Sequence, residues 1–308
     1  MKGPPHVRIA WWSETWEKIA PRCAYWACGY ARSRWRRMRR RKRGTRLEGK
    51  WYCRPECLER GLADVMRRAR ASPRPGARLA HRVPLGLLLL SRQELTAVQL
   101  KMALEAQRVA GVRKIGEWLQ QLGFASEAQI TAALARQWSC PVLRNSSEAL
   151  GASRFSEVPL RLLETFQMIP VQFVESTATL VIAFSEGIDY TLLYAVEQML
   201  GCHTVPCLVC PSVLQLSLRA LAQRRGPGDV VFDRTEEGGE CAQIIGNYTA
   251  KVRAQEVRLA SCGEYFWVRL ERLGQTSVNL VLRAPAHNLS ILTASSKPMA
   301  APTLSSLA

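Results

Sequence analysis

A helical pattern occurs twice in the first half of the chain, and the second copy begins thirty residues after the first. The copies occupy residues 84–107 and 114–137. In each copy apolar residues recur at spacings of four and seven, which places them on one side of a helix. We therefore expect each copy to form a short helix, a turn and a longer helix, with the apolar sides of the two copies packed together. The matching positions are Leu85 and Ile115, Gly86 and Gly116, Leu89 and Leu119, Leu100 and Ile130, Leu104 and Leu134, and Gln107 and Gln137.

A capping residue stands at the start of each longer helix. Thr96 precedes the helix of the first copy, and Ser126 precedes that of the second. Gln129 follows Ser126 by three residues, so this pair can form a capping box that satisfies free backbone N–H groups. We expect the longer helices to begin at Thr96 and Ser126.

Strands and helices are predicted to follow the repeat. Segments rich in β-branched residues alternate with helical ones, and Gly-containing turns separate them. The predicted elements are strands at 171–174, 179–184 and 204–209 and helices at 190–200 and 212–221. Farther along, a helix at 241–253 precedes strands at 256–261, 265–272 and 278–283, and their alternating pattern favours a half-buried antiparallel sheet.

The two copies resemble a motif of the form RLGxxLLxxGxLxxxxLxxxLxxQ. This motif occurs twice in the N-terminal domain of type II secretion and type IV pilus assembly ATPases, which is called the GspE N-terminal or MshEN domain. The strands and helices that follow are similar to the α/β half of that domain, so the resemblance covers residues 82–224. The first copy keeps Leu85, Gly86, Leu89, Leu90, Leu95, Leu100, Leu104 and Gln107, and the second keeps Ile115, Gly116, Leu119, Gly123, Ile130, Leu134 and Gln137.

Some domains of this family bind cyclic di-GMP through the opening Arg of each motif, the Leu side chains and the backbone. This chain departs from the pattern, since Pro84 and Lys114 stand at the two Arg positions and Gln93 replaces a Gly. Lys carries charge but lacks the planar donor fork of Arg, for which Arg82 and Arg113 could compensate. The resemblance implies these ligand contacts: Leu85, Gly86, Leu89, Leu90, Gln107, Lys114, Ile115, Gly116, Leu119 and Gln137. The alternative, which we favour, is a helical scaffold whose Leu and Gln residues serve as core and caps.

Four of the ten cysteines lie near the N-terminus in two close pairs, Cys23 with Cys28 and Cys53 with Cys57. Because the start of the chain has no signal-peptide pattern, such pairs indicate a metal before they indicate disulfides. Two close pairs separated by an intervening segment can supply the four ligands of a tetrahedral zinc ion. Four thiolates leave no position for a catalytic water, so this zinc is predicted to be structural.

The second cysteine pair lies at a turn that leads into an amphipathic helix. This arrangement resembles the FCS and TRASH families of treble-clef zinc fingers. The first pair departs from the resemblance because its spacing is wider than the usual knuckle, and His6 could replace one ligand. The alternative is four unrelated, reduced cysteines. A later pair, Cys207 and Cys210, is interpreted as buried packing, with a redox or metal pair as its alternative.

The net charge of +18 is concentrated in one segment. Residues 1–80 hold 22 Lys and Arg against 6 Asp and Glu, whereas the remaining residues hold 21 against 19. Such a segment attracts polyanions, so nucleic acid, anionic lipid or an acidic protein are possible partners. The alternative is a solvated insertion in the zinc-finger loop. The candidate polyanion contacts are Arg36, Arg37, Arg39, Arg40 and Arg41.

Motifs of common enzyme classes are missing from the sequence. It contains neither the phosphate-binding pattern GxxxxGK[ST] nor GxSxG, and none of its four histidines has a metal or triad spacing. The longest apolar run, at residues 85–90, is far shorter than the roughly 20 residues of a membrane helix. We expect a cytoplasmic protein that is not an enzyme and has no transmembrane segment.

Five segments are predicted in an α+β multidomain architecture. They are a basic zinc-finger-like region at 1–70, a linker at 71–81, the GspE N-terminal-like domain at 82–224, a small α+β unit at 230–284 and a flexible tail at 285–308. The resemblance implies a regulatory or docking protein that binds a protein of a secretion, pilus or signalling assembly. The alternatives are a cyclic di-GMP sensor and a nucleic-acid-binding protein.

Overall fold

The computed structural model describes seven parts of the chain, which are residues 21–29, 44–71, 82–111, 113–143, 157–224, 229–233 and 238–283. His6, most of the predicted linker and the predicted tail lie outside them, as do the candidate polyanion contacts Arg36, Arg37, Arg39, Arg40 and Arg41. The described residues form helices and two β-sheets, so the predicted mixture of α and β structure is confirmed. No helix among them is both long enough and apolar enough to cross a membrane.

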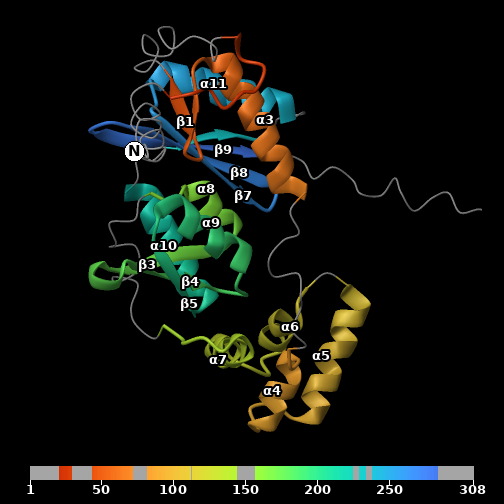
Figure 1. Ribbon diagram of the computed structural model, residues 1–308. Helices are drawn as coiled ribbons and strands as arrows, with labels where there is room; N and C mark the ends of the chain where they lie inside the picture. Colours follow the sequence, from red (N-terminus) through yellow and green to blue (C-terminus); the bar gives the residue numbers. More distant parts are fainter. Residues whose placement is uncertain are drawn as a thin grey trace, which may run out of the picture.

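The double motif folds into four helices that form the lower lobe in Figure 1. The helices are α4 (Leu85–Ser91), α5 (Ala97–Ala110), α6 (Ile115–Gln121) and α7 (Glu127–Trp138). The short helix of each copy packs against the long helix of the other, α4 against α7 and α6 against α5. The predicted helices and their shared apolar core are therefore confirmed, and neither copy is a separate unit.

Both long helices begin with a capping box. The Gln129 backbone N–H donates to Ser126 Oγ at 3.3 Å, and the Ser126 N–H donates to Gln129 Oε1 at 2.8 Å. Thr96 and Gln99 make the same two bonds at 3.2 and 2.9 Å. The predicted helix starts are confirmed, and the first copy has the same capping box as the second.

An α/β half follows the four helices. It contains α8 (Leu160–Thr165), β3 (Met168–Val174), β4 (Thr179–Phe184), α9 (Tyr190–Leu200), β5 (His203–Leu208) and α10 (Pro211–Arg224), with a single 3-10 turn at Glu175–Thr177. The three strands form a sheet in the order β3-β4-β5, in which β3 and β4 are antiparallel and β4 and β5 are parallel. Asp189 caps the start of the crossover helix α9, because its carboxylate accepts a hydrogen bond from the Thr191 N–H at 2.9 Å. The predicted strands and helices of this half are confirmed to within a few residues.

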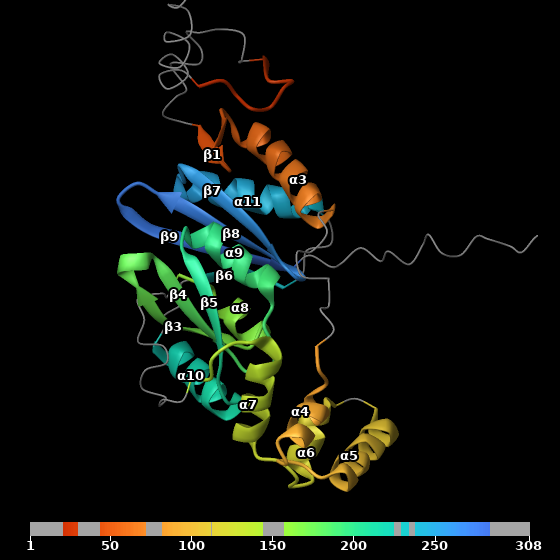
Figure 2. The same ribbon diagram turned by 60° about the horizontal axis from the view of Figure 1, so that its bottom comes forward.

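A six-stranded sheet joins the two ends of the described chain (Figures 1 and 2). Its strands are β1 (Thr45–Leu47), β2 (Lys50–Tyr52), β6 (Asp229–Phe232), β7 (Glu256–Cys262), β8 (Tyr265–Arg272) and β9 (Gln275–Arg283). Their order is β2-β1-β7-β8-β9-β6, with β1 parallel to β7 and β6 parallel to β9. Helices α3 (Pro55–Ala71) and α11 (Gly238–Val252) pack against each other and contact this sheet. The N-terminal and C-terminal segments thus form one structural unit.

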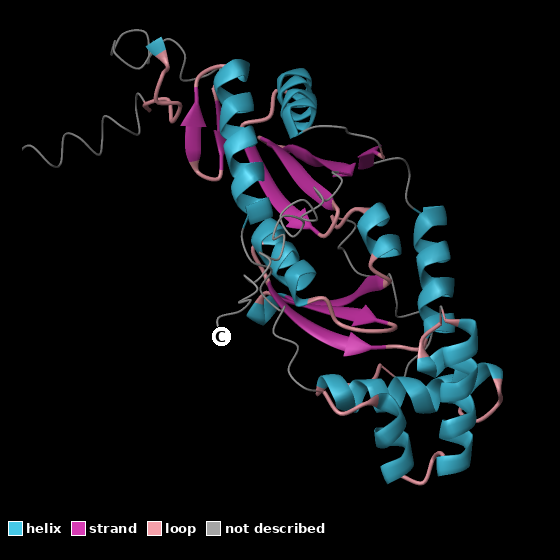
Figure 3. Cartoon of the chain, turned by 90° about the vertical axis from the view of Figure 1, so that its right-hand side faces the viewer, coloured by secondary structure: helices cyan, strands magenta, loops and turns pink. Residues whose placement is uncertain are grey.

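The two sheets are stacked through a layer of helices (Figure 3). Helix α9 lies between them and contacts both β5 and β7. Trp267 of β8 is fully buried in the core that also holds α9, and its indole N–H donates to Asn279 Oδ1 at 3.1 Å. The Asn279 amide in turn donates to the Glu157 carbonyl oxygen at 3.0 Å. These contacts attach the α/β half firmly to the six-stranded sheet.

The turns of the two repeat copies suggest a test of the fold. Gln93 and Gly123 occupy matching positions, and their φ angles are 60° and 69°. A side chain in this left-handed region costs about 1 kcal/mol, which Gly avoids. The substitution Gln93→Gly should therefore raise the free energy of unfolding by up to about 1 kcal/mol, and Gly123→Ala should lower it by about the same amount. Urea unfolding measures both, and a destabilised Gln93→Gly variant would contradict the matched geometry.

Candidate functional sites: a four-cysteine cluster and the repeat interface

Four cysteine thiols meet beside the start of α3. The Sγ atoms of Cys23, Cys28, Cys53 and Cys57 all lie within 4.8 Å of one another. The Sγ atoms of Cys28 and Cys53 are 3.4 Å apart. All four cysteines are buried, and none is in a disulfide. The structure thus brings together the two pairs that the sequence singled out.

Local hydrogen bonds place the two cysteine pairs. The first pair brackets a turn in which the Cys28 N–H donates to the Tyr25 carbonyl oxygen at 3.1 Å. The Ala24 N–H donates to the Trp51 carbonyl oxygen at 2.8 Å and ties this turn to β2. The second pair spans the junction between β2 and α3, so the strand end and the first helical turn face the first pair.

The donor set and its spacing fit a tetrahedral metal ion. Zinc bonds to sulfur at about 2.3 Å, which places four tetrahedral sulfur atoms about 3.8 Å apart. The Cys28–Cys53 separation of 3.4 Å and the upper limit of 4.8 Å for all the pairs bracket that value. Such a site is closed, and the ion would be structural because no ligand position is left for water.

Burial also makes the metal-free cluster costly to ionise. Burial raises the pKa of the Cys53 thiol to about 12, with further contributions from its hydrogen bond to Cys28 and the nearby Cys23. Burial and the neighbouring thiols likewise raise the pKa of Cys57. Thiolates are the metal-binding form, so several of them can form here only together with a compensating cation.

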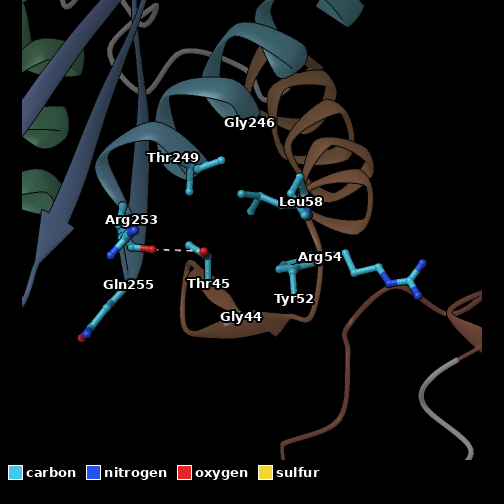
Figure 4. Close-up of a pocket in the computed structure, with 12 residues that line it drawn as sticks. Gly44, Thr45, Tyr52, Arg54, Leu58, Gly246, Thr249, Arg253 and Gln255 are labelled. Carbon is cyan, nitrogen blue, oxygen red and sulfur yellow. Dashed lines mark hydrogen bonds between the residues drawn. The ribbon is translucent and has the colours of Figure 1, made fainter. Parts of the chain in front are cut away.

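A pocket of about 700 Å³ lies close to the cluster, between β1, β2, the start of α3 and the end of α11 (Figure 4). Thr45 Oγ1 donates to the Ala254 carbonyl oxygen at 3.1 Å across its wall. Arg54 and Arg253 are the charged groups among the described residues that line it, and those residues include no histidine, cysteine or carboxylate. The described lining therefore offers no acid–base pair for catalysis.

Two glutamines link the copies of the repeat in a reciprocal way. Gln107 Nε2, at the end of the first copy, donates to the Arg113 carbonyl oxygen at 2.8 Å, just before the second copy begins. Gln137 Nε2, at the end of the second copy, donates to the Val83 carbonyl oxygen at 2.7 Å, just before the first copy begins. Each glutamine thus satisfies a backbone carbonyl at the opening of a motif.

Most of the other candidate ligand contacts lie within the helical core. Leu89 and Leu119 are fully buried, and Leu85 is nearly so, while Leu90 and Ile115 are half-buried. The two glycines allow close helix contacts. A Cβ atom on Gly86 would lie 2.6 Å from a Leu100 methyl carbon, and one on Gly116 would lie 3.3 Å from Ile130.

Cations near the two motif openings have different partners, one in the α/β half and the other in α7. The Lys114 ammonium group forms an ion pair with Glu186. The Arg82 guanidinium lies 3.0 Å from the ring centre of Trp138, and that ring is 6.2 Å from the ring of Tyr190. The partners are far apart in the sequence, so residue spacing gave no signal for these contacts.

A carboxylate on α7 completes the junction between the repeat and the α/β half. Glu127 accepts hydrogen bonds from the Ser212 backbone N–H and hydroxyl, both at 2.7 Å. A carboxylate at the start of α10 satisfies a free N–H group and interacts favourably with the helix dipole. Thr131 Oγ1 of α7 also lies 3.7 Å from Cys210 Sγ. Of the pair predicted to be buried packing, Cys207 is buried, whereas Cys210 is only half-buried.

Neither the family models nor the curated proteins that were compared gave a match. Among solved structures, the chain is similar to the structure of MshE with cdg, at 26% identity over 46% of this chain and 99% of that one, with a TM-score of 0.37. It is also similar to the N-terminal domain of XpsE, at 20% identity over 44% of this chain and 91% of that one, with a TM-score of 0.31. Because these TM-scores are below 0.5, the function proposed below rests on the chain's own residues and contacts.

Proposed function

We propose that the chain is a docking or regulatory protein whose residues 82–224 act like the N-terminal domain of type II secretion and type IV pilus assembly ATPases. The observation that supports this is the double motif, whose Leu, Gly and Gln positions build one four-helix unit and close its ends. The proposed protein works in the cytoplasm as a non-enzyme. The sequence contains no GxxxxGK[ST] pattern, which supports the non-enzymatic part of the proposal.

The outer side of α5 supports binding of another protein. Val98, Met102 and Val109 are 69%, 49% and 89% exposed, and their spacing places them along one side of the helix. In the second copy the matching positions are the smaller residues Ala128, Ala132 and Ser139. Exposed apolar side chains gathered on one helix mark a binding surface more often than scattered ones do. The partner that we propose is a protein of a secretion or pilus assembly.

A double substitution on α5 tests this docking function. The full chain should retain a secretion or pilus component, and Val98→Asp with Met102→Asp should abolish that retention because both charges would enter the interface. Affinity purification with mass spectrometry measures it. The matched control is Leu273→Asp, which changes an 82% exposed residue in the β8–β9 turn. Retention of no such component, or equal retention by both variants, would overturn the proposal.

A cyclic di-GMP sensor is the second candidate, and the motif resemblance supports it. MshE was solved with cdg. The contacts of the candidate residues count against it. Lys114 is paired with Glu186. The candidate contacts Leu85, Leu89 and Leu119 are buried in the helical core. We therefore expect calorimetry to detect no binding at micromolar cyclic di-GMP. Micromolar affinity that Lys114→Ala weakens, while Lys101→Ala leaves it unchanged, would favour the sensor.

We also propose that Cys23, Cys28, Cys53 and Cys57 hold one structural zinc ion. The support is their burial and their mutual spacing. Metal analysis of the purified protein should find one zinc ion per chain. The Cys57→Ser variant should lose it, and Cys202→Ser, a change at a buried cysteine outside the cluster, should keep it. A zinc content near zero in the unmodified protein would disprove the site.

Nucleic-acid binding by the basic run stays a prediction from the sequence. The arginines that carry it lie outside the described residues.

A further inference from the structure

The cysteine cluster lies where the N-terminal hairpin meets the rest of the protein. Strands β1 and β2 have only three residues each, and a hairpin of this size is not stable alone in water. Strand β1 instead pairs with β7, where the Arg46 N–H donates to the Gln255 carbonyl oxygen at 2.8 Å. The Glu48 N–H donates to the Val257 carbonyl oxygen at 3.3 Å. The hairpin thus depends on a strand about two hundred residues away for its backbone hydrogen bonds.

The apolar residues of the same region have no core of their own. Leu47 and Leu62 are 1% and 0% exposed, and both belong to the core that contains Ile245, Phe266 and Leu280. Helix α3 lies along α11, and Figure 2 shows α3 and β1 against the strands of the C-terminal segment. The two segments therefore share one hydrophobic core, so loosening one exposes apolar surface of the other.

The cysteines connect the pieces that make these contacts. Cys53 directly follows β2, and Cys57 lies in the first turn of α3. The loop holding Cys23 and Cys28 is tied to β2 through the bond from the Ala24 N–H to the Trp51 carbonyl oxygen. One ion bound to all four sulfur atoms would fix loop, strand and helix to one another, which two three-residue strands cannot do alone.

We infer that metal binding at the four cysteines keeps the hairpin and α3 on the C-terminal sheet, so that the cluster is a clasp between the two ends of the chain. The inference rests on the proposed zinc site and goes beyond it. A zinc finger that folds independently would leave the sheet unchanged when it loses its metal. If the cluster is a clasp, loss of the metal should release β1 from β7 and uncover the apolar surface of α11 that α3 covers.

Hydrogen exchange of the full chain, with its metal and after removal by a chelator, tests the clasp. Metal removal should speed exchange at the Arg46 and Glu48 amides and throughout residues 55–71, by tenfold or more. It should also speed exchange in α11, which lies outside the cluster. Strands β3 and β4 belong to the other sheet and should keep their exchange rates, so they serve as an internal control. Cys57→Ser should reproduce the effect without a chelator, and Cys202→Ser should not.

The possible outcomes separate the two proposals. A purified protein without metal overturns the zinc site, and the clasp with it. A protein that binds one zinc ion, but keeps β1 and α11 protected after the metal is removed, overturns the clasp and leaves the zinc site standing. Faster exchange of equal size in β3 and β4 would mean general unfolding, which also contradicts a local clasp.

Discussion

The parallel pairing of β1 with β7 determines how this chain is organised. It makes an N-terminal hairpin part of a sheet whose other strands come from the C-terminal segment. In the sequence, residues 82–224 therefore lie between two segments that fold together into one unit. Long-range pairing of this kind carries a loop-closure cost, which the buried contacts between α3 and α11 offset. A metal at the cysteine cluster would add a further constraint at the same place.

Two copies of one motif form the helical unit, and their contacts are nearly symmetric. Each short helix packs against the long helix of the other copy, and each terminal glutamine closes the opening of a motif. The symmetry ends at the surface. Leu134 of α7 packs against the core of the α/β half, whereas its counterpart Leu104 of α5 is 47% exposed. One long helix is thus attached to the rest of the molecule, and the other presents apolar side chains to solvent.

The residues that the family resemblance marks as ligand contacts serve here mainly as scaffold. Most of the leucines and both glycines among these candidate contacts pack inside the four helices, and both glutamines bind backbone carbonyls. The cations at the motif openings are engaged as well, Lys114 with Glu186 and Arg82 with Trp138. Binding of a dinucleotide would have to compete with these internal contacts. A docking role requires no such competition, which is why it is the first proposal.

The sequence by itself determined the local structure: the repeated helices, their capping residues, most strands of the α/β half and the two cysteine pairs. Those features depend on periodicity and on contacts within a few residues, which a single sequence records. Only the tertiary structure decided that β1 joins the C-terminal sheet, that Glu127 caps α10 and that Lys114 pairs with Glu186. These partners lie tens to hundreds of residues apart, and no local pattern encodes which distant groups will meet. For the cysteines, spacing predicted that the pairs converge, and the fold decided that they converge beside a shared core.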